Sequence, residues 1–154
     1  FSFFLDAYDH MAGMWLVGED MPQAGNRVTL HASEKDRFGM AIPNVHYDDH
    51  ANDVAMRGHA FGRGKALYEA IGAKRTLLTP PYPSTHNLGT CRMSEKAADG
   101  VVDRWGKAHE LPNLFISDGS QFTTSAAENP TLTIVSLAIR QADHIAREMS
   151  AGTL

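Results

Sequence analysis

A long amphipathic stripe near the C-terminus limits the possible folds of this chain more than any other segment. Between residues 130 and 149, apolar side chains recur at spacings of three and four: Leu132, Val135, Ala138, Ile139, Ala142, Ile145, Ala146 and Met149. This period predicts an α-helix about 30 Å long that buries one face against other structure. Pro130 suits the first helical position and Asn129 suits the cap before it, so the helix is expected to begin there.

Shorter patterns predict further elements in the first half of the chain. Apolar and polar side chains alternate over residues 27–31, which is typical of a half-buried strand, and residues 40–47 are a second strand candidate. Pro43 removes a backbone donor from that second strand and places it at an edge or a bulge. Residues 54–71 have helical spacing, and the helix is expected to end at Gly72.

Two more segments precede the C-terminal helix. Residues 75–79 are a short strand candidate, and the prolines of residues 79–84 exclude a helix there. Three large apolar residues follow one another within residues 113–118, which predicts a strand buried on both faces. The last third of the chain is therefore expected to hold one buried strand followed by the long helix.

Composition excludes several classes of protein. The 154 residues are the size of one domain, and 43% apolar and 21% charged residues are typical of a globular protein. The net charge of −4 gives no basic footprint for nucleic acid. The single cysteine, Cys91, excludes an internal disulfide framework, and no apolar run in this sequence is long enough to span a bilayer.

Two candidate sites are explained more simply by local structure. His46 and His50 have the spacing of zinc ligands on a helix, but they lack the glutamate next to the first histidine that the metalloprotease pattern requires. A solvated polar loop is the favoured interpretation, with a metal hydrolase site as the alternative. Cys91 lies beside Arg92, which could activate its thiol, yet a small buried side chain without a resolving cysteine is favoured.

His86 and Asn129 are stronger candidates. His86 follows a proline-rich loop and precedes Gly89, so a rigid, non-helical backbone would hold its imidazole as a general base. A structural or exposed histidine is the alternative. Asn129 lies between the predicted strand that ends at Asp118 and Gly119 and the start of the long helix. A strand, a short loop and a helix N-terminus form an anion-binding arrangement, although Asn129 could act as a helix cap alone.

Five segments, taken in order, resemble those of the glucose–methanol–choline (GMC) oxidoreductases. Residues 84–93, STHNLGTCRM, resemble the first catalytic motif of that family, and residues 100–103, GVVD, follow at the usual distance. Residues 113–120, NLFISDGS, look like the strand of its flavin domain, and residues 129–134, NPTLTI, look like its last motif. Residues 26–30, NRVTL, resemble the start of its substrate domain. The shared order makes the resemblance specific.

The resemblance implies an FAD enzyme that oxidises alcohol groups. His86 matches the catalytic histidine, which would accept the substrate hydroxyl proton. Asn129 matches the second position of the active-site pair, which is His in some members and Asn in others, and would orient the substrate oxygen. The implied cofactor-binding residues are Asp118 and Gly119 near the flavin phosphate and ribityl region, and Asn129, Pro130 and Thr131 near the flavin pyrimidine. No metal ligand is implied.

The resemblance also implies an α+β fold shared between two domains. Residues 1–110 would form a substrate-binding domain, with a mainly antiparallel sheet backed by helices. Residues 111–154 would return to the FAD-binding domain as one strand and one long helix. The Gly-rich dinucleotide fingerprint of the family is missing, because Gly62 and Gly64 follow no strand and lack a third glycine. The chain is therefore expected to be the C-terminal portion of an enzyme, inactive and without tightly bound FAD when isolated.

The expected partners are a small-molecule alcohol, with sugars and polyols among the candidates, and the N-terminal FAD-binding portion. Ser94 stands where the family often has glycine, a small departure that casts little doubt on His86. The choice between oxidase and dehydrogenase, the electron acceptor and the compartment, cytoplasm or bacterial periplasm for a soluble protein, stay open. The alternative from another class is a stand-alone small-molecule binding module without catalysis, which the missing fingerprint favours.

Overall fold

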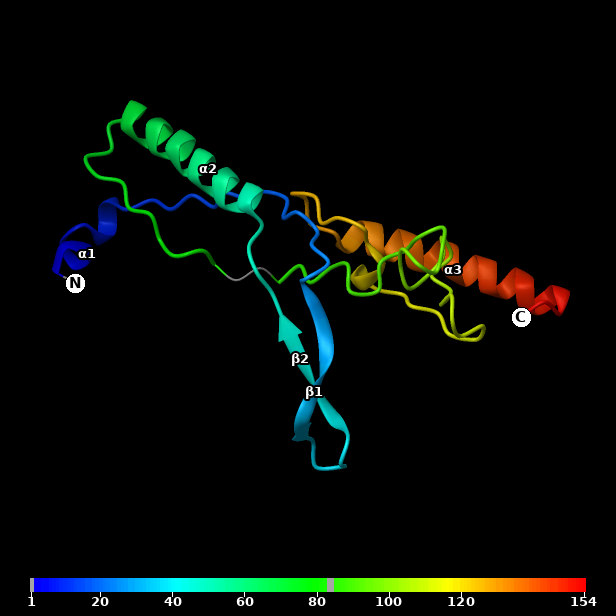
Figure 1. The fold of residues 1–154 in the computed structure, drawn as a ribbon. Helices are drawn as coiled ribbons and strands as arrows, with labels where there is room; N and C mark the ends of the chain where they lie inside the picture. The colour runs from blue at the N-terminus through cyan, green and yellow to red at the C-terminus, as the bar shows by residue number, and fades with distance from the viewer. Residues whose placement is uncertain (1, 83–84) are drawn as a thin grey trace.

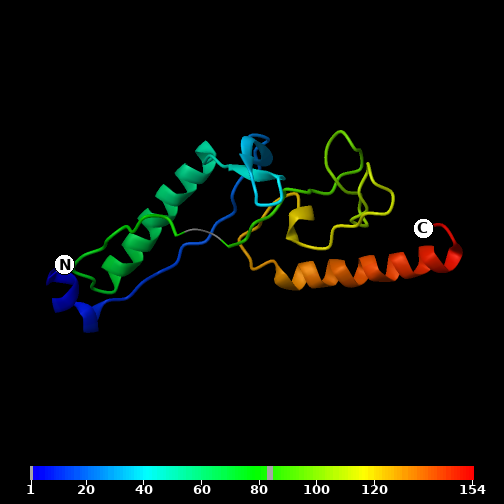
Figure 2. The same cartoon turned by 90° about the horizontal axis from the view of Figure 1, so that it is seen from below.

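The described residues combine helices with an antiparallel hairpin, which confirms the α+β class. The structure is a computed structural model that describes residues 2–82 and 85–154. The elements in chain order are α1 (Ser2–Asp6), the 3₁₀ turn η1 (Tyr8–His10), β1 (Arg27–Lys35), β2 (Ala41–His46), α2 (Ala51–Ala70), the 3₁₀ turn η2 (Gly119–Gln121) and α3 (Thr131–Ala151). Figures 1 and 2 show α2 and α3 on opposite sides of the base of the hairpin, with residues 85–121 folded beside α3.

The hairpin forms where alternation predicts strands, but its apolar face is uncovered. β1 pairs antiparallel with β2, with Val28 opposite Val45 and Leu30 opposite Pro43. The register shifts between Leu30 and Lys35, so Pro43 lies beside an irregularity as expected. The expectation of a half-buried strand is wrong: Val28, Leu30 and Val45 are 50%, 74% and 71% exposed. The reason is that the hairpin projects away from both long helices (Figure 1).

His50 caps the start of α2, and Asp53 ties the helix to the segment before the hairpin. The His50 Nδ1 atom accepts the Asn52 N–H at 3.1 Å, and the Asp53 carboxylate accepts the His50 N–H at 3.3 Å in return. Asp53 is only 1% exposed, and its other oxygen accepts the Met21 N–H at 3.1 Å. The predicted end of the helix is confirmed, because Gly72 follows the last turn with a φ of 90°.

Two predicted strands are absent from the described residues. Residues 75–79 form no regular strand, and within residues 113–118 there is only an isolated bridge between Lys107 and Phe115. Leu114 is exposed, so the prediction of a strand buried on both faces is wrong. Such a strand needs neighbours along its whole length on both sides, whereas the described residues pair with this segment briefly and on one side.

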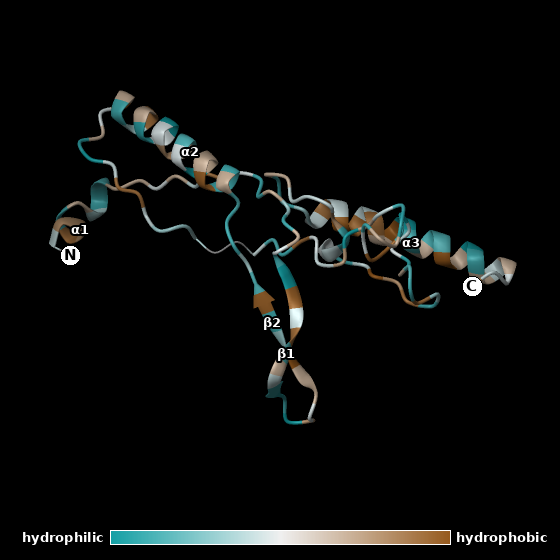
Figure 3. Cartoon of the chain, in the orientation of Figure 1, coloured by the Kyte–Doolittle hydropathy of each residue, from teal (hydrophilic) through white to brown (hydrophobic). Residues whose placement is uncertain are grey.

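The long C-terminal helix is confirmed as α3, and its two faces differ. The face toward residues 85–121 carries buried or half-buried side chains: Ile134, Leu137, Ala138, Gln141, His144, Ile145 and Glu148. The other face carries large apolar residues that are between 48% and 79% exposed: Leu132, Val135, Ile139 and Met149. Apolar and polar residues alternate along the helix accordingly (Figure 3). The predicted stripe is therefore only partly covered by the described residues.

The buried apolar core of the described residues lies in the loops beside α3. Val102 is completely buried, and Ala108 is nearly so. Val102 forms a single-residue parallel bridge with Met93 and a single-residue antiparallel bridge with Ala108. These bridges hold together a region that has little regular secondary structure. Among the described residues, no helix has the length and apolar content needed to cross a membrane.

Candidate active site

Gly119 lies where three segments that carry predicted site residues meet. A Cβ atom at this position would lie 2.5 Å from Leu88 Cδ2 and 3.2 Å from Ile134 Cδ1, with the Asn87 carbonyl oxygen at 3.8 Å. Asn87 and Leu88 directly follow His86, and Ile134 lies in the first turn of α3. A Cβ atom at the first of these distances would force the Leu88 side chain to move, so glycine at 119 lets the three segments approach one another without that rearrangement.

The loop after His86 is held along η2 by its backbone. The Cys91 N–H donates to the Ser120 carbonyl at 2.9 Å, and the Met93 N–H donates to the Gln121 carbonyl at 2.8 Å. The loop turns at Gly89, whose φ of 85° favours glycine. The predicted first motif and the predicted flavin-contacting turn are therefore joined directly.

Asp118 shapes the turn that leads into Gly119. It has an extended backbone and takes the cap position of η2, where its Oδ1 atom accepts the Ser120 N–H at 2.8 Å. The side chain is otherwise on the surface. Its contact with a cofactor stays a prediction, as do those of Gly119, Pro130 and Thr131, since the structure contains the chain alone.

The start of α3 differs from the prediction by one residue. The cap position is taken by Pro130, and α3 begins at Thr131. Pro130 already has helical torsion angles, φ −85° and ψ −10°, and its carbonyl accepts the Ile134 N–H at 3.0 Å. The prediction that Asn129 caps the helix is therefore wrong, because the cap position belongs to Pro130 and no side-chain cap bond forms. No side-chain cap bond forms at Pro130, so the first N–H groups of α3 lack that acceptor.

His86 and Asn129 occupy two of the segments that meet at Gly119. His86 is half-buried, and Asn129 is exposed just before α3. The structure brings their segments together through Leu88 and Ile134. That both side chains reach the same substrate oxygen stays a prediction. Pro83 and Ser84, which belong to the proline-rich loop and to the predicted first motif, lie outside the described residues.

The other histidine pair has separate local roles. His50 caps α2, whereas the His46 Nε2 atom lies 3.0 Å from an Asp48 carboxylate oxygen on the surface. Among residues 2–82 and 85–154, no group of three or more metal-ligating side chains comes together. Cys91 is half-buried and reduced. Local contacts therefore account for His46 and His50, the two histidines with the spacing of zinc ligands.

The clearest pKa shifts lie near the start of α2, away from Gly119. Hydrogen bonds from Arg57 hold the pKa of Asp49 below its ordinary value, and the same pair raises the pKa of Arg57. Partial burial raises the pKa of Tyr47, and the nearby carboxylates of Asp20 and Asp49 add to this effect. All three shifts favour the protonation states that these groups have at neutral pH, so they are structural in character.

Comparison with known proteins decides the family. A family model described as GMC oxidoreductase matches residues 22–138, which is most of the chain. The chain belongs to the GMC oxidoreductase family. The match covers His86, the turn at Gly119 and the first turns of α3, so the structural meeting point lies inside the matched region.

Named relatives of this GMC family chain include dehydrogenases and oxidases. It is 38% identical to the 2-methyl-1,2-propanediol dehydrogenase of Mycolicibacterium austroafricanum, over 97% of this chain and 28% of the relative. It is 30% identical to the fructose dehydrogenase large subunit of Gluconobacter japonicus, over 93% of this chain and 26% of that subunit. A C-glycoside 3-oxidase of Microbacterium trichothecenolyticum is 35% identical over 84% of this chain and 26% of its own length. The chain thus spans about a quarter of the length of these relatives.

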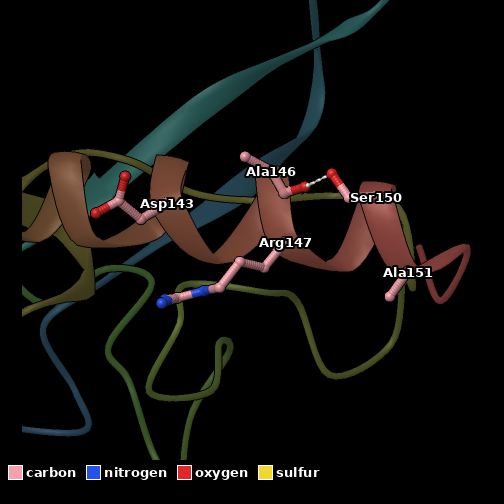
Figure 4. Close-up of a pocket in the computed structure, with 5 residues that line it drawn as sticks. All are labelled: Asp143, Ala146, Arg147, Ser150 and Ala151. Carbon is pink, nitrogen blue, oxygen red and sulfur yellow. Dashed lines mark hydrogen bonds between the residues drawn. The ribbon is translucent and has the colours of Figure 1, made fainter.

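Two open depressions on this GMC family chain lie elsewhere. One is lined by α3 alone, through Asp143, Ala146, Arg147, Ser150 and Ala151 (Figure 4). Its dashed contact, from the Ser150 hydroxyl to the Ala146 carbonyl at 2.8 Å, is internal to the helix. The other is lined by Met93, Ser94, Glu95, Asp103, Arg104 and Trp105. Neither contains a predicted site residue, so the candidate site is the meeting of three segments and not either depression.

Proposed function

We propose that this GMC family member takes part in the FAD-dependent oxidation of a CH–OH group, with sugars and polyols as the first alcohols to test. The observation that carries the proposal is the meeting at Gly119 of the loop after His86 and the helix after Asn129. The relatives support it, since they are named for 2-methyl-1,2-propanediol, fructose and a C-glycoside. Each of these compounds carries hydroxyl groups.

The residues at this meeting point suit a flavin. The first N–H groups of α3 have no side-chain cap, and the positive end of this 21-residue helix favours a carbonyl oxygen or a negative charge. A flavin ring presents such acceptors along its polar edge. The residues proposed to hold FAD are Asp118, Gly119, Asn129, Pro130 and Thr131. FAD, when bound, would supply the acceptor for the hydride that leaves the substrate carbon.

His86 would act as the general base in this reaction. Its imidazole would accept the proton of the substrate hydroxyl, a step that contributes about 10²–10⁴-fold in typical enzymes. Asn129 would donate a hydrogen bond from its amide to the same oxygen and so hold the substrate in one orientation. That role is compatible with the structure, because Asn129 is exposed and does not cap α3.

Replacement of His86 tests the proposal. In the complete gene product, His86→Ala is expected to lower kcat and kcat/KM together by about 10²–10⁴-fold, with FAD content unchanged by absorbance. His59→Ala is the matched control, because His59 is exposed on α2. Activity of His86→Ala within about threefold of wild type would show that this histidine is structural.

The binding-module alternative makes a different prediction for the same preparation. A gene product with the mass of this chain alone, which binds a small-molecule alcohol without FAD, would favour that alternative. Intact mass and flavin absorbance together therefore distinguish the two functions before any variant is made.

A further inference from the structure

Gln141 is a polar residue on the inward face of α3. It is only 6% exposed, and its neighbours along the same face include Ile134, Ala138 and Ile145. Burial of an amide side chain is unfavourable unless its polar atoms find hydrogen-bond partners. A glutamine at this position therefore requires a specific set of contacts.

Both amide protons of Gln141 have partners on the loops beside α3. The Nε2 atom donates to the Trp105 carbonyl and to the Ile116 carbonyl, each at 2.8 Å. The backbone chains at these two positions also pair with each other, since the Ile116 N–H donates to the Gly106 carbonyl at 2.8 Å. The Gln141 amide thus adds two hydrogen bonds beside the backbone pairing of these two segments. It joins both segments, at Trp105 and at Ile116, to α3.

Gly106 makes room for this contact. It has a φ of 75°, and a Cβ atom there would lie 2.1 Å from Gln141 Nε2 and 2.6 Å from the Ile116 carbonyl oxygen. Position 106 therefore accepts no side chain while the amide is in place. The glycine and the glutamine form one unit, contributed by two segments far apart in the sequence.

The contacts of Gln141 differ from the other links between α3 and these loops. Arg140 donates to the Arg104 carbonyl, and the His144 ring stacks on Trp105 with a centroid distance of 4.4 Å. Those two links reach the loop at 104–105 alone. Gln141 also binds the Ile116 carbonyl, two residues before Asp118, and so connects the helix to the turn at Gly119.

Two attachments along one face of α3 fix the position of its N-terminus relative to the turn at Gly119. Ile134 packs beside Gly119, and Gln141 follows it by seven residues, which is two turns or about 10 Å along the axis. Arg140 and His144 hold α3 to the loop at 104–105, so Ile134 alone would leave the helix end able to shift relative to the turn at Gly119. The second contact, made through directional hydrogen bonds to fixed carbonyls, restricts this shift.

We propose that Gln141 is a positioning residue for FAD: through Trp105 and Ile116 it sets the N-terminus of α3 relative to the turn at Asp118 and Gly119. This inference rests on the proposed function. Gln141 itself touches neither cofactor nor substrate in this proposal. Its effect reaches the cofactor site through the position of the helix end and of the turn.

The test compares FAD affinity across a graded series in the complete gene product. Gln141→Met keeps the length of the side chain and removes both donors, and FAD added to the apoprotein is expected to bind at least about tenfold more weakly. Gln141→Asn keeps an amide that is one methylene shorter, so its affinity is expected to lie between Gln141→Met and wild type. Asp143→Met is the matched control on the exposed side of α3, with unchanged affinity.

Hydrogen exchange supplies a second readout that does not depend on turnover. Amide exchange in residues 114–121 is expected to rise in Gln141→Met, while the melting temperature shows that the variant remains folded at the assay temperature. If Gln141→Met does not fold, Gln141→Asn decides the question by the same two measurements. FAD affinity within about twofold of wild type in the folded variants would overturn the inference and leave the proposed function standing. A wild-type protein that binds no FAD would instead overturn the proposed function.

Discussion

The half of the structure around α2 and the half around α3 are built in opposite ways. Around α2, regular helix and strand form where their patterns predict them, yet large apolar residues such as Val28 and Leu67 remain exposed. Around α3, residues 85–121 have little regular structure, yet they contain the buried Val102 and provide the hydrogen-bond partners of Gln141 on the helix. The hairpin and α2 thus form with little close packing, whereas irregular loops pack closely on the inner face of α3.

The difference shows where the candidate site obtains its geometry. Loops carry binding and catalytic residues when a rigid scaffold positions them. Here the scaffold of the loop after His86 consists of backbone bonds to η2 and of the close approach at Gly119. Within α2, by contrast, the only buried residues are Asp53 and Gly64. They contact the extended segment before the hairpin, and neither is a predicted site residue.

Two buried glycines, one in each half, give the largest test of this comparison. Gly119→Ala places a Cβ atom 2.5 Å from Leu88 and 3.2 Å from Ile134, so it is expected to destabilise the protein by about 2 kcal/mol and to weaken FAD binding. Gly64→Ala is the matched control, because its Cβ atom would make ordinary contacts at 3.4 Å or more with Met14 and Leu16. Alanine also suits a helix interior better than glycine by up to about 1 kcal/mol, so Gly64→Ala is expected to be neutral or stabilising.

Thermal melting and FAD titration of both variants in the complete gene product decide the result. Equal melting temperatures for Gly119→Ala and Gly64→Ala would show that the three segments can separate without loss. The comparison between the two halves would then lose its physical basis.

Periodicity was sufficient to predict the elements that stand alone. The spacing of apolar residues predicted both long helices, and Gly72 ends α2 as expected. Both strands of the hairpin were also predicted, the first as far as residue 31 and not to Lys35, and Pro43, expected at an edge or a bulge, lies beside a register shift. Each of these features depends on local preferences, which a single sequence contains.

Features that depend on distant partners could not be predicted in this way. The segment 113–118 reads as a buried strand, but the number of neighbours beside it is a property of the whole fold. The cap prediction for Asn129 was wrong because Pro130 takes the cap position and no side-chain cap bond forms at the start of α3. The sequence contains one sign of the buried role of Gln141 that periodicity alone does not use. This polar residue lies three after Ala138 and four before Ile145, where the apolar stripe requires an apolar residue.

Substitution of Asn129 tests whether the half around α3 contributes to turnover as well as to stability. Since it does not cap α3, Asn129→Asp is expected to leave the melting temperature unchanged. Turnover is expected to fall at least about tenfold, a barrier increase of about 1.4 kcal/mol, because a carboxylate cannot donate to the substrate oxygen and repels developing negative charge. Asn113→Asp adds the same charge at another exposed position and is expected to leave turnover unchanged. Normal turnover in Asn129→Asp would leave His86 as the only proposed catalytic side chain.

Asp53 provides the smallest expected effect, in the half that carries no predicted site residue. Its carboxylate accepts the N–H groups of Met21 and His50, so Asp53→Ala leaves two donors without these acceptors. Met21 is exposed and His50 is half-buried, so water recovers part of this loss, and the expected decrease in the free energy of unfolding is about 1 kcal/mol. Asp53→Asn retains one acceptor oxygen and is expected to lose less, while Asp99→Ala, at an exposed loop position, controls for the removal of a charge.

FAD affinity and kcat are expected to be unchanged in all three variants at temperatures where they are folded. A fall in FAD affinity for Asp53→Ala alone would mean that the segment before the hairpin reaches the cofactor site, and that the two halves act together.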